Sequence, residues 1–75
     1  MSPDVGLALI GPGAIAEAHL AAFERLGGIA PLWAVGRSLE RTRSFADRWG
    51  IPQAETSIDA ALSDPFVSTV LICSP

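Results

Sequence analysis

The stretch Val5-Gly-Leu-Ala-Leu-Ile-Gly-Pro-Gly-Ala-Ile-Ala16 decides the fold of this 75-residue chain. Residues 5–10 are a continuous apolar run, which is typical of a strand buried on both faces of a parallel sheet. The run stops at Gly11-Pro-Gly13, and a segment with helical periodicity follows from Ala14 to Leu26. The order of strand, glycine turn and helix predicts the first half of a β-α-β unit.

Gly11-Pro-Gly13-Ala-Ile-Ala16 has the spacing G-x-G-x-x-A, and its position between a strand and a helix favours dinucleotide binding. Gly11 would permit the tight turn, Gly13 would let a pyrophosphate approach the backbone, and Ala16 would let the helix pack close to the strand. Free N–H groups at the helix start would face the phosphates. The predicted pyrophosphate-binding residues are therefore Gly11, Pro12, Gly13, Ala14 and Ile15. The alternative is a glycine-rich turn that merely joins strand to helix.

The rest of the chain continues the alternation of short apolar runs and helical segments. Further strands are expected over residues 32–35, over at most a very short part of 51–55, and over 66–73, where the strand would be buried. A second helix is expected from Leu39 to Trp49, capped by Ser38 and closed by Gly50. A short third helix should end at Leu62, behind a sequence around Thr56 that resembles a capping box.

Each longer helix shows one apolar stripe that is expected to face the sheet. The first stripe is Ile15, His19, Phe23 and Leu26, and the second is Leu39, Thr42, Phe45, Ala46 and Trp49. Together the elements predict an α/β fold: a partial Rossmann-type, doubly wound parallel sheet of about four strands and three helices, with strand order 3-2-1-4. Residues 1–75 would form the N-terminal part of one dinucleotide-binding domain, with the fourth strand as a long apolar edge prone to aggregation.

The composition narrows the possible functions. The net charge is −3, and the five basic residues are all arginines, so the chain offers no catalytic lysine. This mildly acidic charge argues against nucleic-acid binding, and no apolar run approaches the roughly 20 residues of a membrane helix. One cysteine and one histidine cannot form a disulfide or a Cys/His metal site. We therefore expect a cytoplasmic protein without a metal, a membrane or a nucleic acid as partner.

The end of the second strand indicates the cofactor. NAD-binding domains usually place an acid there to hold the adenosine ribose hydroxyls, but this chain has Val35-Gly-Arg-Ser38. Arg37 would attract the 2′-phosphate of NADP, and Ser38 would add a hydroxyl donor. We predict NADP as the preferred cofactor and NAD as a possible one. Alternatively, Arg37 is a solvated loop residue or stacks on adenine; S-adenosylmethionine is disfavoured by the same missing acid.

For several other residues the sequence gives weaker evidence of a functional role. Arg41 and Arg43 follow closely, and Arg41 is the better candidate for a phosphate contact, although a solvated helix face explains both. Histidine 19 has no acid–base partner and is expected to pack near the sheet, and Cys73 is expected to be an inert buried thiol. Ser74 and Pro75 end the fourth strand at the carboxyl edge, where they would line the cofactor cleft.

Several of these segments together resemble the N-terminal domain of the Gfo/Idh/MocA oxidoreductases. The similar segments are residues 8–16 followed by His19, the Gly36-Arg-Ser38 turn, Trp49-Gly-Ile-Pro52 and Asp64 to Pro75. The resemblance implies an NAD(P)-dependent oxidoreductase that moves a hydride between nicotinamide and a sugar, cyclitol or related polyol or carbonyl compound. It also implies that Gly36 occupies the place where NAD-preferring members often hold an acid.

The resemblance further implies that the catalytic lysine, the substrate domain and the surface of a homo-oligomer lie beyond residue 75. No catalytic residue is therefore assigned, and the 75-residue chain alone is expected to be inactive although its parent would be an enzyme. The alternative is a non-catalytic dinucleotide-binding module or a degenerate fragment.

Overall fold

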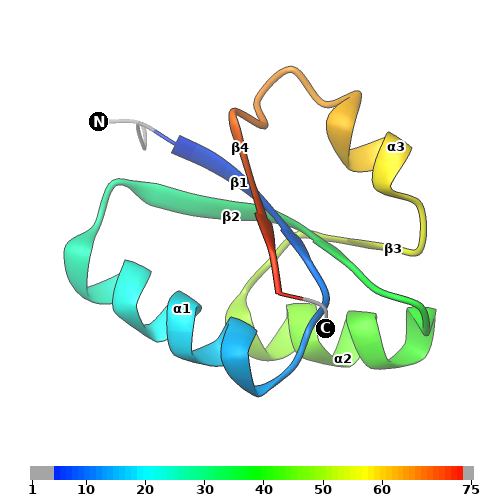
Figure 1. Cartoon of the computed structure of the whole chain (residues 1–75), viewed down its shortest axis with the longest axis horizontal. Helices are drawn as coiled ribbons and strands as arrows, with labels where there is room; N and C mark the ends of the chain where they lie inside the picture. Colours follow the sequence, from blue (N-terminus) through cyan, green and yellow to red (C-terminus); the bar gives the residue numbers. More distant parts are fainter. Residues whose placement is uncertain (1–4, 74–75) are drawn as a thin grey trace.

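The computed structural model describes residues 5–73, which form four strands and three helices (Figure 1). The strands are β1 (Val5–Ile10), β2 (Ile29–Val35), β3 (Gln53–Glu55) and β4 (Thr69–Ile72), and the helices are α1 (Ala14–Leu26), α2 (Leu39–Trp49) and α3 (Ile58–Leu62). Within these residues the strands pair in parallel in the order β3-β2-β1-β4. The structure therefore confirms the predicted α/β, Rossmann-type sheet with order 3-2-1-4.

The helices cover the two faces of the sheet unequally. Helices α1 and α2 lie together on one face, and the short α3 lies on the other (Figure 1). The larger core, beneath α1 and α2, consists of Leu9, Ala16, Leu20, Ala34, Phe45, Ala46, Ile51 and Ala54. A smaller core beneath α3 consists of Ala8, Ile10, Val35 and Ala61. Neighbouring residues of β1 thus enter different cores, as a strand buried on both faces requires.

Both ends of α2 follow their local signals. The Ser38 hydroxyl oxygen accepts the Arg41 backbone N–H at 3.3 Å, which caps α2. At the other end of α2, Gly50 has a φ of 69° and adopts the left-handed conformation that ends many helices. The predicted bounds of α1 and α2 are both confirmed. The cap at Ser38 fixes where the chain leaves β2, and so places the residues between β2 and α2.

Strand β2 begins at Ile29 rather than at residue 32, because its ladder accommodates a proline. Pro31 has no N–H to donate and is unfavourable in a strand ladder, yet it lies inside β2. The pairing with β1 is irregular at this point: Leu7 pairs with Pro31 and Ala8 pairs with Trp33, so one residue of β2 is passed over. Irregular positions of this kind tolerate proline within a sheet.

The face of α1 that meets the sheet differs from the prediction. Ala16 and Leu20 are its buried residues, whereas Ile15 is 63% and Leu26 is 77% exposed. Helix α1 is apolar nearly all round, so two stripes with helical spacing compete. The stripe that carries alanine allows the closer approach to the sheet. The predicted stripe is therefore wrong for Ile15, His19 and Leu26, and only Phe23 packs, partly buried, against the core.

Three other expectations need correction. Leu39 was expected to be buried but is 53% exposed, since it is the first residue of α2. Strand β4 is shorter than predicted and mostly exposed, because within residues 5–73 it pairs only with β1. The N-cap of α3 is Ser57 rather than Thr56, and its side chain makes no capping bond. With Ser57 as N-cap, Asp59 is only two residues further on, one short of a capping box.

Within residues 5–73, no helix is long and apolar enough to cross a membrane.

Candidate dinucleotide-binding site

A cleft of about 520 Å³ lies at the carboxyl edge of the sheet. Its lining comes from the ends of the strands, the segments that follow them and the first turn of α2: Ile10, Gly11, Pro12, Val35, Gly36, Arg37, Ser38, Arg41, Thr42, Thr56, Ile58 and Cys73. The volume is within the range of small-ligand sites. Ligands of open α/β sheets bind outside the carboxyl ends of the strands, so this cleft is the candidate site.

The glycine turn leads from β1 to α1 along this cleft. Gly11 has a φ of 92°, which lies in the region that favours glycine, so the predicted tight turn is confirmed. Its N–H donates to the Val35 carbonyl oxygen at 2.8 Å. The turn is thereby tied to the end of β2, and Pro12 lines the cleft beside it. The start of α1 is held next to the segment that leads into α2.

The first turn of α1 carries free backbone donors. Its first hydrogen bond runs from the Glu17 N–H to the Gly13 carbonyl oxygen at 2.9 Å, so the N–H groups of Ala14, Ile15 and Ala16 have no intrahelical acceptor. No side chain within residues 5–73 caps this end. A Cβ built at Gly13 would meet no atom within 4 Å. The open space and the free donors fit a pyrophosphate at this helix start.

Arg37, Ser38 and Arg41, which we call the basic arm, line the cleft at the start of α2. All three residues are exposed, and the residues that line the cleft in the described part of the chain include no acid. The Ser38 hydroxyl accepts the helix-capping N–H and so keeps its own proton free to donate. A guanidinium binds a phosphate through two parallel N–H bonds. The basic arm therefore suits a phosphate monoester.

Cys73 and His19 contribute no acid–base or nucleophilic pair to this cleft. Cys73 lines the cleft, and partial burial raises the pKa of its thiol, which keeps the thiol protonated at neutral pH. His19 is exposed on α1, and its ring stacks on that of Phe23 with the centroids 6.1 Å apart. The expectation that His19 packs near the sheet is wrong, because the neighbouring stripe of α1, with Ala16 and Leu20, faces the sheet.

The structure brings together in the cleft the predicted residues Gly11, Pro12, Arg37 and Ser38. The predicted residues Gly13, Ala14 and Ile15 lie exposed at the adjoining start of α1. Of the two arginines with weaker functional readings, Arg41 lines the cleft and Arg43 does not. The last two predicted residues, Ser74 and Pro75, lie outside the described residues.

Thr56 and Ile58 line the cleft although sequence reasoning did not assign them to the site. Thr56 directly follows β3, whose last residue is Glu55. Its position after a parallel strand places it at the same edge as the ends of β1, β2 and β4. That position could have identified Thr56 as a cleft residue, but the sequence pattern was interpreted only as a helix cap.

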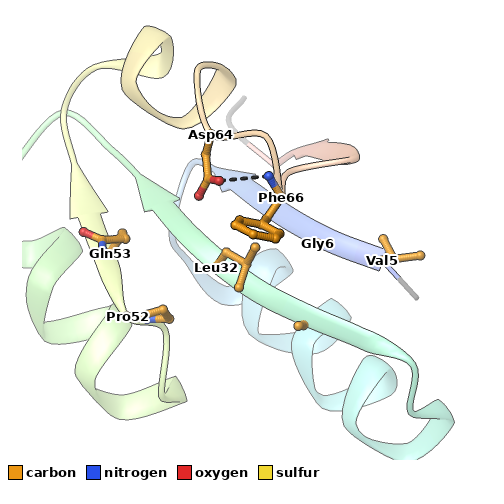
Figure 2. A pocket seen from close by; sticks show the side chains of 8 residues that line it. Val5, Gly6, Leu32, Pro52, Gln53, Asp64 and Phe66 are labelled. Atoms are coloured by element: carbon orange, nitrogen blue, oxygen red, sulfur yellow. Dashed lines mark hydrogen bonds between the residues drawn. The ribbon is translucent and has the colours of Figure 1, made fainter. Parts of the chain in front are cut away.

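A second pocket, of about 310 Å³, lies near the amino ends of β1, β2 and β3 (Figure 2). Asp64 faces it and accepts hydrogen bonds from the Trp33 indole N–H at 2.7 Å and the Phe66 backbone N–H at 2.9 Å. The Trp33 bond, and after it the Phe66 bond, holds the pKa of the Asp64 carboxyl below its ordinary value. The two hydrogen bonds of the Asp64 carboxylate hold the loop between α3 and β4 against Trp33 of β2. We therefore assign Asp64 a structural role.

No family model matches the chain. Among curated proteins, 4-carboxy-2-hydroxymuconate-6-semialdehyde dehydrogenase from Sphingobium sp. is 29% identical over 69 residues, which are 92% of this chain and 22% of that dehydrogenase. Among solved structures, GenD2 from gentamicin A biosynthesis in complex with NAD has a TM-score of 0.89 and 27% identity, covering 100% of this chain and 21% of GenD2. Levoglucosan dehydrogenase in complex with NADH and L-sorbose has a TM-score of 0.88 and 20% identity, covering 100% of this chain and 22% of that structure.

The chain therefore spans about a fifth of the length of the proteins it matches, which are 22%, 21% and 22% covered. These proteins are dehydrogenases or NAD-bound structures, and the structural likeness extends along the whole chain. The fold is thus that of a Rossmann-like α/β domain, and the cleft lies at the edge of the sheet where such folds bind their ligands.

Proposed function

We propose that this chain is the N-terminal part of the dinucleotide-binding domain of an oxidoreductase and that it prefers NADP to NAD. The observation that carries this proposal is one cleft that extends from the Gly11-Pro12 turn, beside the uncapped start of α1, to a basic arm without an acid. The pyrophosphate would bind the backbone N–H groups of Ala14 and Ile15, and the adenosine 2′-phosphate would bind Arg37 and Ser38. Ser74 and Pro75 would flank the same cleft.

The bound dinucleotide would supply or accept the hydride at its nicotinamide. The residues of this chain would bind and orient the cofactor, and the substrate-binding part would lie outside them. This division is supported by the coverage of the curated dehydrogenase, of which the chain matches only 22%. The proposed substrate is a sugar, cyclitol or related polyol or carbonyl compound, since the similar proteins include a semialdehyde dehydrogenase and a structure with L-sorbose. Assembly of the whole protein as a homo-oligomer stays a prediction.

The test is a comparison of NADP and NAD binding by the intact protein and two arginine variants. Arg37→Gln should weaken NADP binding by about tenfold to a hundredfold, because a charged hydrogen-bonded pair contributes roughly 1.5–3 kcal/mol. The affinity for NAD, which lacks the 2′-phosphate, should change less than about threefold. Calorimetric titration or the quenching of tryptophan fluorescence would measure both dissociation constants.

Arg43→Gln is the matched control, since Arg43 is an exposed arginine of α2 that does not line the cleft. It should leave both affinities unchanged. An equal loss of NADP and NAD affinity in Arg37→Gln would contradict the assignment of Arg37 to the 2′-phosphate. Wild-type protein that binds neither dinucleotide would contradict the proposed function itself.

A further inference from the structure

Gly36, the first residue after β2, is enclosed by two neighbours in the cleft. A Cβ built at this position would lie 2.5 Å from Thr42 Oγ1, and 2.9 and 3.1 Å from the Cδ and Cγ of Pro12. The first of these separations is far inside van der Waals contact, so a side chain at position 36 requires its neighbours to move. The position is therefore closed to any residue but glycine while Thr42 and the Pro12 ring stay in place, and Thr42 makes the closer of the two contacts.

The backbone does not impose this restriction. Among residues 5–73, the glycines whose φ lies in the left-handed region are Gly11, Gly27, Gly28 and Gly50, and Gly36 is not one of them. An L-residue could adopt the conformation of Gly36 without backbone strain. Glycine is needed at position 36 only because of what lies beside it, and the nearest of these atoms is the Thr42 hydroxyl oxygen.

Thr42 cannot readily retreat from this contact. It is fully buried, and the neighbouring Phe45 and Ala46 anchor α2 in the larger core. Its β-branched side chain has few rotamers in a helix. Its Oγ1 has no hydrogen-bond partner within the described residues, so no bond explains why a hydroxyl stands there. A buried hydroxyl without a partner is unfavourable for stability, so the reason to keep threonine at this position is not its hydrogen bonding.

The consequence concerns the cofactor, because position 36 is where a carboxylate would be placed to select NAD. An acid at the end of the second strand holds the ribose hydroxyls of NAD and repels the 2′-phosphate of NADP. The contact with Thr42 excludes such an acid. Arg37 thereby becomes the first side chain after β2 that can reach the ribose.

We propose that Thr42 is a specificity-determining residue, which keeps position 36 bare and so holds the site in its NADP-preferring form. This proposal rests on the proposed NADP-binding function. It assigns the cofactor preference to packing between α2 and the end of β2 as well as to the charge of Arg37. Exchanging the preference therefore requires a substitution at Gly36, a smaller residue at Thr42 and a small shift of the Pro12 ring.

The experiment measures the coupling between positions 36 and 42 in the intact protein. Gly36→Asp alone should lower the unfolding temperature without cofactor by about 5 °C or more, as overpacking does. Adding Thr42→Ala should recover part of that loss, because it removes the closer of the two contacts and leaves the Pro12 ring in place. The double variant should shift the ratio of NAD to NADP affinity toward NAD by at least about tenfold relative to the wild type.

Thr42→Val is the matched control, because valine places a methyl group where threonine has either its hydroxyl or its own methyl group. Relative to the Thr42→Val single variant, which gains stability by losing the unpartnered hydroxyl, it should not rescue Gly36→Asp, since its bulk is nearly that of threonine. If Gly36→Asp does not fold, Gly36→Ala with and without Thr42→Ala provides the same comparison with the smallest side chain. For this pair too, the unfolding temperature should fall with the first change and recover with the second.

Two results would overturn the proposal. One is a Gly36→Asp or Gly36→Ala protein that unfolds at the wild-type temperature; the other is an equal rescue, or no rescue, by Thr42→Ala and Thr42→Val. A wild type that binds NADP while either result holds would overturn the role of Thr42 and leave the proposed function standing. A wild type that binds neither dinucleotide would overturn both.

Discussion

At the scale of single residues, different physical constraints explain why glycine stands at different positions of this chain. Gly13 has open space where a Cβ would stand, whereas a Cβ at Gly6 would collide with the Phe66 carbonyl oxygen. The φ of Gly13 is 164°, which is extended backbone open to any residue. Nothing within the described chain therefore requires glycine at position 13, but a ligand that approaches the backbone there would.

This contrast predicts opposite outcomes for the same substitution. Gly13→Ala should leave the unfolding temperature without cofactor unchanged and weaken dinucleotide binding by about tenfold or more, because the added methyl group stands where the pyrophosphate would lie. Gly6→Ala should lower the unfolding temperature, because it forces the loop at Phe66 away from β1. Thermal unfolding and ligand titration of both variants would check this. A destabilised Gly13→Ala that binds normally would mean that Gly13 is structural.

Asp64 predicts a dependence of stability on pH. Its carboxylate accepts N–H bonds from Trp33 and Phe66, which lower its pKa from the ordinary 3.8 in the folded state. The charged form therefore stabilises the folded protein above the ordinary pKa, and this stabilisation is lost as the pH falls from about 5 through 3.8 toward the lowered pKa. Asp64→Asn should flatten this part of the stability profile, as measured by denaturant unfolding across that range.

The control for Asp64 is Asp47→Asn on the exposed surface of α2. It should reproduce the wild-type profile, because Asp47 is an exposed acid distant in sequence from the loop that Asp64 ties down. A profile for Asp64→Asn that matches the wild type would show that the two N–H bonds do not stabilise the charged form.

At the scale of elements, α1 and α2 are joined mainly by their shared apolar core. One ion pair also links them: Arg48 Nη1 lies 2.6 Å from Glu17 Oε1, with 63% and 35% of the side chains exposed. An exposed pair of this kind is screened by water and salt. The burial of Leu20, Phe45 and Ala46 against the sheet therefore decides the placement of these helices.

A double-mutant cycle on Glu17→Gln and Arg48→Gln should give a small coupling energy. We expect about 0.2–1 kcal/mol at low salt, falling further at high salt. Phe45→Ala should destabilise the protein by about 3 kcal/mol or more, because it empties the core beneath both helices. A coupling energy above about 2 kcal/mol would contradict this ranking of the two effects.

At the scale of the whole molecule, the cleft is lined by residues at the ends of all four described strands. A ligand bound there would contact several elements at once, so its binding should stabilise the folded state. Strand β4 is an edge within the described residues, and one face of the sheet is covered only by the five residues of α3. The cleft that holds the proposed cofactor joins the segments after β1, β2 and β3 to the end of the sheet.

A ligand that binds only the folded state should therefore stabilise this chain measurably. At a hundred times its dissociation constant, NADP should add about 2.7 kcal/mol. For a domain of this size that corresponds to a rise in unfolding temperature of roughly 10 °C or more. Thermal unfolding with NADP, with NAD and with adenosine 5′-monophosphate at matched multiples of their dissociation constants would check it. Absence of a rise with NADP at saturation would contradict binding to the folded state.

What the sequence by itself determined is the set of features with a local cause. The apolar run 5–10, the glycine turn, the Ser38 cap and the end of α2 at Gly50 each depend on a few neighbouring residues, and the structure confirms them. The strand order also follows, because parallel β-α-β units leave few topologies. For the same reason, the carboxyl edge of the sheet could be predicted to carry Gly11, Pro12, Arg37 and Ser38.

Only the tertiary structure decided which of several equivalent patterns is used. Helix α1 offers two apolar stripes, and packing of Ala16 against the sheet selected the one that leaves His19 exposed. Pairing with β1 extends β2 across Pro31, although the local strand propensity of proline disfavours a strand at that residue. The close approach of Thr42 to Gly36 brings the buried face of α2 against the end of β2. Such choices depend on the distance between elements, which is set by the summed packing of the core and has no signature in any single stretch of sequence.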